Sequence, residues 1–193
     1  MGAGASSKTD GPAEAKIPYF YLQGMTTMKE KREVIMEVLN NEKELGELEE
    51  FLKKEFADEL VAFVVAAQGY ARSAPDADMP TRFSNASKIF DEFVKQGSAR
   101  QINVSGKVLK TATKELKALE SAAGPEGPGD DPDLGKNLFE KLQSDIVDLM
   151  AKDKLRRFSE VRRSVCSEAE IKAMLKDAME QGLITQPAQS LML

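Results

Sequence analysis

The sequence predicts an all-α protein, and three features of the chain carry this prediction. Apolar residues recur at spacings of three and four along most of the chain, which is typical of amphipathic helices. Two capping boxes, Thr27 with Glu30 and Ser167 with Glu170, mark the starts of helices. The long stretch Phe51–Tyr70 contains valines that also suit a buried strand, but its apolar run is longer than an ordinary strand.

This stretch is expected to supply the central helix of the fold. It begins amphipathic, is interrupted at Phe56–Asp58 and then runs apolar until Gly69. We therefore expect a corner, followed by a helix that neighbouring elements cover on most sides. Before it, the capping box at Thr27 opens a helix to about Leu39, and a second helix is expected over Glu44–Lys54.

Helical spacing continues after the central helix, with proline and glycine marking the interruptions. Two prolines predict a loop over Ser73–Pro80, which is followed by a helix over Thr81–Gln96 that Gly97 ends. Residues Ala99–Val104 are expected to form a connector, and Ser105 is expected to cap the next helix.

Glycine, proline and acidic residues exclude both helix and strand over Gly124–Gly135, which is expected to be a surface insertion. The chain then resumes as a helix over Leu138–Met150. A basic helix is expected from Asp153 to Arg163, and the capping box at Ser167 opens an accessory helix.

These elements predict three parts of the chain. Residues 1–22 form a flexible tail that ends in the aromatic cluster Ile17–Leu22, which is expected to pack on the core as a strap. Residues 23–165 form the helical domain that contains the 124–135 insertion. Residues 166–193 form the C-terminal helix and tail.

The tail begins with the pattern M-G-x-x-x-[ST], which predicts N-myristoylation of Gly2. A single myristoyl chain gives only weak, reversible membrane binding, and no cysteine lies nearby for a second acyl chain. We therefore expect a cytoplasmic protein at the inner face of the plasma membrane, with a membrane-bound partner as the second anchor. The sequence contains no apolar run long enough to span a bilayer.

The composition limits the classes of function. A net charge of −5 argues against nucleic acid as the main partner, and the single Cys166 suits a reducing compartment. The chain has no histidine, the commonest general base, and no glycine-rich phosphate loop or EF-hand spacing. We therefore expect a monomer that is not an enzyme and that holds no cofactor or metal. The basic stretch Lys152–Arg163 is either a solvated helix face or a surface for phosphate, anionic lipid or an acidic protein.

Four stretches, in this order, resemble the domain of the regulators of G-protein signalling (RGS). They are EFLKKEFADELVAFVVAAQGY at Glu50–Tyr70, ASKIFDEFV at Ala86–Val94, RQINVSG at Arg100–Gly106 and LFEKLQSDIVDLMAKDKLRRF at Leu138–Phe158. The resemblance extends from about Glu30 to Ser164. It implies an RGS-like bundle of about nine helices, beyond which this chain adds the C-terminal accessory helix.

The resemblance also implies a function. RGS domains bind the switch regions of a GTP-loaded Gα subunit of a heterotrimeric G protein and accelerate GTP hydrolysis, which damps G-protein signalling. They supply no catalytic acid or base, because Gα already holds its arginine and glutamine and needs only its mobile switches steadied. The alternative function is an RGS-homology module that docks Gα or another partner without activating the GTPase.

Carried over by position, the Gα-facing surface comprises three segments. The residues are Glu55, Phe56, Ala57, Glu59 and Leu60 at the corner, Asn103 in the connector, and Leu149, Asp153, Lys154 and Arg157 near the chain's basic helix. In the family the asparagine lies against the Gα glutamine, which a short uncharged amide can orient. Arg157 is expected to pair with Asp153 and to hold that carboxylate toward Gα backbone donors.

The sequence departs from the family pattern at three positions. The family usually has serine at Ala57, asparagine at Leu60 and tryptophan at Val64. Loss of the serine removes a helix cap worth about 1 kcal/mol unless Asp58 caps instead. We expect Leu60 to face outward, because the resemblance aligns it with a partner-facing asparagine. The tryptophan lost at Val64 only makes the core smaller. Ala57 and Leu60 favour the docking module, whereas the retained Asn103 and the retained pair of Asp153 with Arg157 favour GTPase activation.

Overall fold

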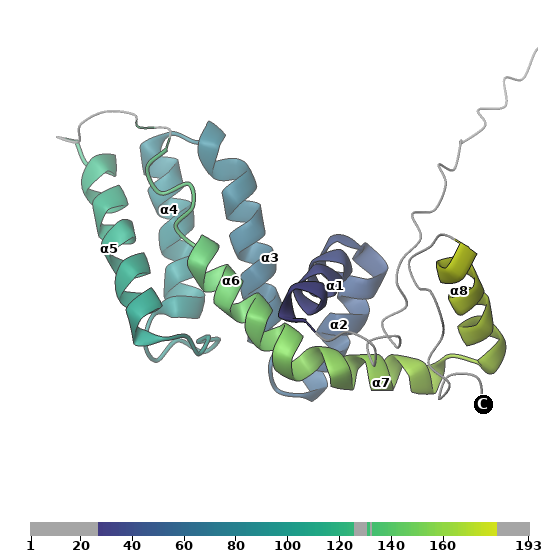
Figure 1. Cartoon of the computed structure of the whole chain (residues 1–193). Coiled ribbons are helices and arrows are strands. Elements are labelled where there is room, and N and C mark those ends of the chain that lie inside the picture. Colours follow the sequence, from purple (N-terminus) through teal and green to yellow (C-terminus); the bar gives the residue numbers. More distant parts are fainter. Residues whose placement is uncertain (1–26, 126–130, 132, 181–193) are drawn as a thin grey trace, which may run out of the picture. The chain divides into compact units, whose positions relative to one another are not determined.

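The computed structural model describes residues 27–125, 131 and 133–180, and within this part of the chain it is all-α (Figure 1). The predicted fold class is confirmed, because the described residues form eight α-helices and no strand. The described residues divide into two compact units, one of residues 27–158 and one of residues 159–180. The whole predicted tail of residues 1–22, with the strap Ile17–Leu22, lies outside the described residues, so the three-part division stays a prediction.

Eight α-helices follow one another along the described part of the chain. They are α1 Met28–Asn40, α2 Glu42–Lys54, α3 Asp58–Ser73, α4 Met79–Ile89, α5 Gly106–Ala123, α6 Glu140–Leu149, α7 Leu155–Val165 and α8 Glu168–Glu180. Short segments η2 (Ala74–Asp76), η3 (Phe90–Val94) and η4 (Met150–Lys154) extend α3, α4 and α6.

Side-chain caps start several of these helices where the sequence predicts them. The Thr27 hydroxyl accepts a hydrogen bond from the Glu30 N–H at 3.3 Å, and the Glu30 carboxylate accepts one from the Thr27 N–H at 3.0 Å. Ser105 caps α5 by accepting from the Val108 N–H at 3.4 Å. In the second unit, Ser167 and Glu170 form the same reciprocal box at the start of α8.

Two predicted boundaries are wrong. The loop expected over Ser73–Pro80 is mostly helical: α3 continues through Ser73, and α4 begins at Met79 with Asp78 as its cap. Pro80 lies in the first turn of α4, where a helix does not need the missing N–H.

The predicted break before Asp153 is also absent. η4 joins α6 to α7 as a π-helical turn, and Asp153 lies inside this turn instead of opening a helix. A π-turn adds one residue to the helical turn, so the side chains after it point in different directions than they would in a continuous α-helix. The helix predicted over Thr81–Gln96 ends similarly in a π-turn, η3, after which Gly97 takes a left-handed φ of 83°.

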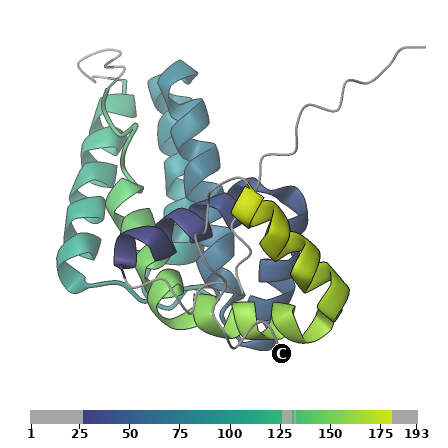
Figure 2. The same ribbon diagram turned by 45° about the vertical axis from the view of Figure 1, so that its right-hand side comes forward.

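The core is organised around α3, which packs against α2, α4 and α6 (Figure 2). The Phe63 ring lies at the centre, 5.8 Å from the Phe93 ring of η3 and 6.0 Å from the Phe139 ring before α6. The Tyr70 ring, two turns later on α3, lies 5.2 Å from the Phe139 ring. Val64, where the family usually has tryptophan, is fully buried in this core.

A buried arginine binds the backbone of the turn before α6, at Asp131 and Leu134, to α4. Arg82 of α4 is only 2% exposed, and its guanidinium donates to the carbonyls of Asp131 and Leu134 at 2.8 Å and of Ala77 at 3.0 Å. The Tyr70 hydroxyl donates to the Gly135 carbonyl at 2.9 Å. The described end of the predicted insertion is therefore tied to α3 and α4. Residues 126–130 and 132 lie outside the described part of the chain.

The buried Tyr70 hydroxyl at this turn makes the stability of the fold decrease as the pH rises in the alkaline range. Burial raises the pKa of Tyr70 from 10.0 to about 12, although the charge of Arg82 acts in the opposite direction. The folded state thus favours the neutral phenol. The contribution of this phenol to the free energy of unfolding is fully present below pH 10 and is lost as the pH rises toward 12. We predict that Tyr70→Phe costs about 1 kcal/mol at pH 7, through the lost hydrogen bond.

The same variant is expected to lack the alkaline loss of wild type, which is on the order of 1 kcal/mol by pH 11. Urea unfolding at pH 8 to pH 11 measures both effects. Parallel stability curves for the two proteins across this range would contradict the prediction.

Candidate functional site

The corner between α2 and α3 exposes an aromatic ring on a strained backbone. Phe56 has a φ of 52°, the only positive φ at a described non-glycine residue, and its side chain is 93% exposed. Hydrogen bonds hold the corner, from the Phe56 N–H to the Lys53 carbonyl at 3.2 Å and from the Ala57 N–H to the Leu52 carbonyl at 2.9 Å. A strained residue that projects an apolar ring into solvent is a candidate for a binding role.

Two predicted contact residues at this corner face inward. Leu60 is only 4% exposed and Ala57 is also buried, so the outward orientation expected for Leu60 is wrong. The physical reason is that burial of a leucine side chain is favourable by roughly 2 kcal/mol, whereas an exposed leucine gains nothing. Asp58 does not replace the lost serine cap either, because Ala57 is the N-cap residue and no side chain caps α3. Glu59 is half-buried in the first turn.

Four charged side chains connect the corner to η4 and the start of α7. Arg157 contacts Asp153 at 3.2 Å and Glu55 at 2.5 Å, while Lys154 contacts Asp153 at 3.1 Å and Glu55 at 3.6 Å. The predicted pair of Arg157 with Asp153 is therefore confirmed. The hydrogen bond from Lys154, together with the charges of Lys154 and Arg157, holds the pKa of Asp153 below its ordinary value. The Asp153 carboxylate stays ionised, and Lys154 and Arg157 together hold it in place.

The connector holds Asn103 between two fixed points. Ile102 is buried, and its N–H donates to the Phe93 carbonyl at 2.8 Å. Ser105 caps α5 on the other side. Asn103 itself is exposed, and within the described residues its side-chain amide makes no hydrogen bond. The amide is thus presented to solvent from a constrained backbone.

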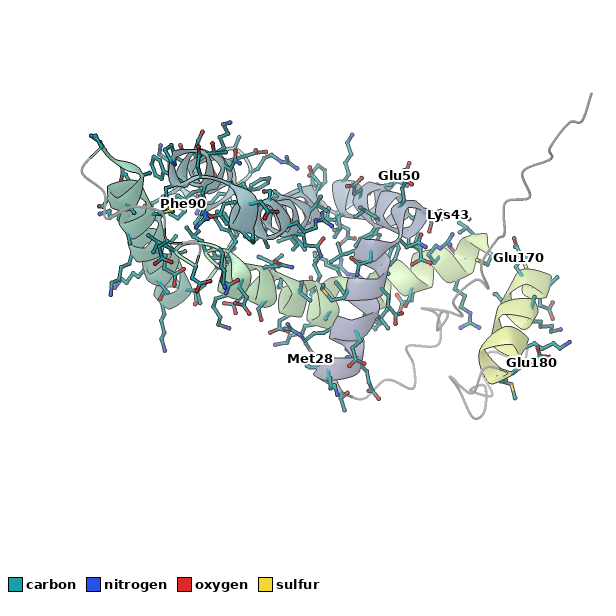
Figure 3. All side chains as sticks on the ribbon, turned by 90° about the horizontal axis from the view of Figure 1, so that it is seen from above. Met28, Lys43, Glu50, Phe90, Glu170 and Glu180 are labelled. Carbon is teal, nitrogen blue, oxygen red and sulfur yellow. The ribbon has the colours of Figure 1, made fainter. Side chains whose placement is uncertain are left out.

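Asn103 and Leu149 line the same hollow, which has a volume of about 480 Å³. Its other lining residues are Met28, Val104, Ser105, Asp145, Asp148 and Lys152. Leu149 is 37% exposed at the end of α6, and Met28 is exposed at the start of α1 (Figure 3). Lys141 pairs with Asp145 at 2.8 Å and Arg32 pairs with Asp148, so each of the two carboxylates in the hollow forms an ion pair with a basic side chain.

The structure thus gathers the three predicted segments within one unit. The corner meets η4 and α7 through the charged cluster, and the connector meets the end of α6 through the hollow. The lipidation residue Gly2 lies outside the described residues. In the part of the chain that the structure describes, no group of three or more Asp, Glu or Cys side chains is placed to hold a metal ion, and no helix is long and apolar enough to cross a bilayer.

Sequence reasoning missed Arg100. This residue pairs with Glu92 at 2.9 Å and with Asp58 at 3.7 Å, and its guanidinium lies 5.0 Å from the centre of the Phe93 ring. The stretch RQINVSG begins with it, but a sequence gives no sign that this arginine meets an acid more than forty positions earlier.

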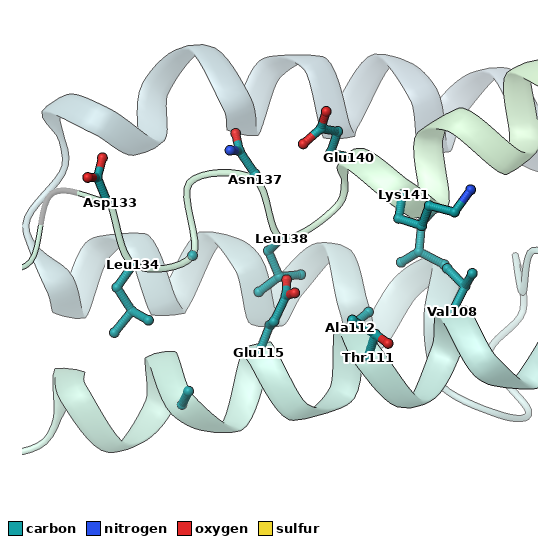
Figure 4. Close-up of a pocket in the computed structure, with 13 residues that line it drawn as sticks. Val108, Thr111, Ala112, Glu115, Asp133, Leu134, Asn137, Leu138, Glu140 and Lys141 are labelled. Atoms are coloured by element: carbon teal, nitrogen blue, oxygen red, sulfur yellow. The ribbon is translucent and has the colours of Figure 1, made fainter.

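A second groove lies between α5 and the segment before α6 and contains no predicted site residue (Figure 4). It has a volume of about 370 Å³, and its apolar floor includes Val108, Ala112 and Leu138. Glu115 and Glu140 stand at its edge, and burial raises the pKa of Glu115.

The comparison with protein families agrees with this arrangement. The family model of the Regulator of G protein signaling domain matches residues 35–163, which is more than half of the 193-residue chain. The match covers the corner, the connector, η4 and nearly all of α7. The chain belongs to the RGS domain family.

Several curated relatives carry the family name. The chain is 30% identical over 121 residues to Regulator of G-protein signaling rgs-7 of Caenorhabditis elegans, a match that covers 63% of this chain and 13% of that protein. It is 29% identical over 108 residues to Regulator of G-protein signaling 1 of Homo sapiens, which covers 56% and 43%. It is 25% identical over 153 residues to Regulator of G-protein signaling 5 of Sus scrofa, which covers 79% and 72%. The chain thus spans less than half the length of the first two relatives.

The buried position of Leu60 leads to a stability prediction. Leu60→Asn truncates a packed side chain and buries an amide, so it is expected to lower the free energy of unfolding by about 2–4 kcal/mol. Leu149→Asn makes the same chemical change at a half-exposed position and is expected to cost less than about 1 kcal/mol. Urea denaturation of both variants measures these costs. Equal, small losses would show that Leu60 faces solvent in solution.

Proposed function

We propose that this chain binds the switch regions of a GTP-loaded Gα subunit, accelerates GTP hydrolysis and so damps G-protein signalling. The observation that carries the proposal is the family match over residues 35–163, because it spans all three segments of the site. The names of the relatives, each a regulator of G-protein signaling, support the same class of function. The chain itself would contribute no catalytic group, since Gα supplies the reacting residues.

The geometry supports a mechanism of positioning. Asn103 presents an unpaired amide from a constrained backbone, and the family resemblance places such an asparagine against the Gα glutamine. A short amide can orient that glutamine without adding a charge. Leu149, beside it in the same hollow, offers an apolar contact to a switch segment. Rigid groups of this kind stabilise a transition state because they need no rearrangement when the partner binds.

The corner and the charged cluster would hold the rest of the Gα switches. Phe56 offers an exposed ring, which suits an apolar contact at the centre of an interface. Asp153 keeps its negative charge through Lys154 and Arg157 and can accept hydrogen bonds from switch backbone N–H groups. Glu55 orients both cations toward the corner.

A specific observation favours a second candidate, a docking module that binds Gα without activating it. Ala57 and Leu60 stand where the family usually has serine and asparagine, and both are buried, so the corner lacks the helix cap and the partner-facing amide. Single-turnover GTP hydrolysis by purified Gα, with and without this chain, separates the candidates. Acceleration supports the activator, whereas binding with unchanged hydrolysis supports the module.

Asn103→Ala tests the activator directly. Because Asn103 is exposed and its side chain is unpaired, we expect the melting temperature to stay within a few degrees of wild type. The acceleration of hydrolysis is expected to fall at least about tenfold, equivalent to roughly 1.4 kcal/mol of transition-state stabilisation. Asn137→Ala, at an exposed asparagine outside the three segments, is the matched control and should retain full activity. A large fall in melting temperature with normal activity would make Asn103 structural.

We also propose that a myristoyl chain on Gly2 recruits the protein to the inner face of the plasma membrane. One such chain binds a bilayer only weakly, so a membrane-bound Gα partner would provide the second attachment.

Gly2→Ala removes the acylation site and is expected to move the protein from the membrane fraction to the soluble fraction of cells. Ser7→Ala, in the same tail but outside the required pattern positions, serves as the control. Metabolic labelling with an alkyne myristate analogue reports the modification itself. Identical fractionation of wild type and Gly2→Ala would overturn the proposal.

A further inference from the structure

Arg100 is the side chain that links the connector to the corner. It lies three residues before Asn103, and it pairs with Glu92 of η3 at 2.9 Å and with Asp58, the first residue of α3, at 3.7 Å. Its guanidinium also lies over the Phe93 ring at 5.0 Å. One arginine therefore touches both the helix that begins at the corner and the element that holds the connector.

The chemistry of arginine suits this position. A guanidinium is planar, so it can place its face on an aromatic ring while its edges donate to two separate carboxylates. Phe93 is buried, and its carbonyl also accepts the hydrogen bond from Ile102 in the connector. Phe93 thus contacts Arg100 through its ring and anchors the backbone beside Asn103 through its carbonyl.

These contacts contribute more to position than to stability. The Arg100 side chain is 39% exposed, and ion pairs at such positions are typically worth at most about 1 kcal/mol each. Their geometric effect is larger, because Asp58 is two residues from Phe56 while Arg100 is three residues from Asn103. Without Arg100, the described residues contain no other ion pair between the connector and the start of α3.

We propose that Arg100 is a positioning residue that fixes the connector relative to the corner, so that Asn103 and Phe56 meet one partner as a single rigid surface. The proposal rests on the proposed function of this site. It requires that loss of Arg100 loosens the connector in the free protein and lowers the maximal rate of activated hydrolysis, although Arg100 touches neither GTP nor the reacting atoms.

The first test uses the free protein. Arg100→Gln is expected to keep the melting temperature within a few degrees of wild type and to raise the hydrogen-exchange rate of the Ile102 amide at least about fivefold, measured by NMR. Lys95→Gln removes an equal charge from an exposed pair with Asp91 beside η3, and should leave that rate unchanged. Equal exchange rates in the two variants would overturn the proposal.

The second test measures hydrolysis by Gα at saturating concentrations of each variant. Arg100→Gln should lower the maximal rate at least about threefold, Arg100→Lys should restore part of it, and Lys95→Gln should match wild type. A wild-type protein that gives no acceleration would refute the proposed activity, while the exchange measurement still decides the role of Arg100. Faster exchange without any change in the maximal rate of an active wild type would overturn the link to Asn103.

Discussion

The burial of α3 is the constraint on which the rest of this unit depends. A helix whose side chains are apolar on most sides must be covered by several neighbours, and Phe63 contacts the aromatic rings that two of them bring. Each neighbour also carries one segment of the site. α2 ends at the corner, η3 anchors the connector through Phe93, and α6 leads from Phe139 to Leu149. The site is therefore a consequence of how one helix is covered.

Apolar burial alone does not align the three segments, because hydrophobic contacts are not directional. Half-exposed ion pairs at the edge of the core supply contacts that do depend on direction. Glu55 joins the corner to Lys154 and Arg157, and Arg100 joins the connector to Asp58. Each pair contributes little to the free energy of folding, but its two charged partners must lie close together, which restricts the relative position of the segments that carry them. Stability and alignment thus come from different interactions in the same unit.

The sequence was most informative where structure depends on near neighbours. Capping boxes, helical spacing and the break at Phe56 are local, and the structure follows them closely. The errors arise where distant residues decide the outcome. Helical spacing does not distinguish a π-turn at Asp153 from a break, and it gives no sign of the side chain that Arg82 inserts beneath a distant turn. The site was located through family resemblance, which identifies positions but not side-chain orientations.

Leu60 shows the limit of carrying a site over by position. The resemblance aligns it with a partner-facing asparagine, yet a leucine at that place in the helix turns toward the core because its burial lowers the free energy of folding. The substitution thus exchanges a polar contact with a partner for internal packing. Beside it, the exposed ring of Phe56 on a strained backbone remains at the corner. If this corner binds Gα as proposed, its contribution to affinity must come mainly from an apolar anchor at Phe56, and orientation must come from Asn103 and Asp153. A partner with an apolar switch surface opposite the corner would then be preferred over one that requires a hydrogen-bonding asparagine.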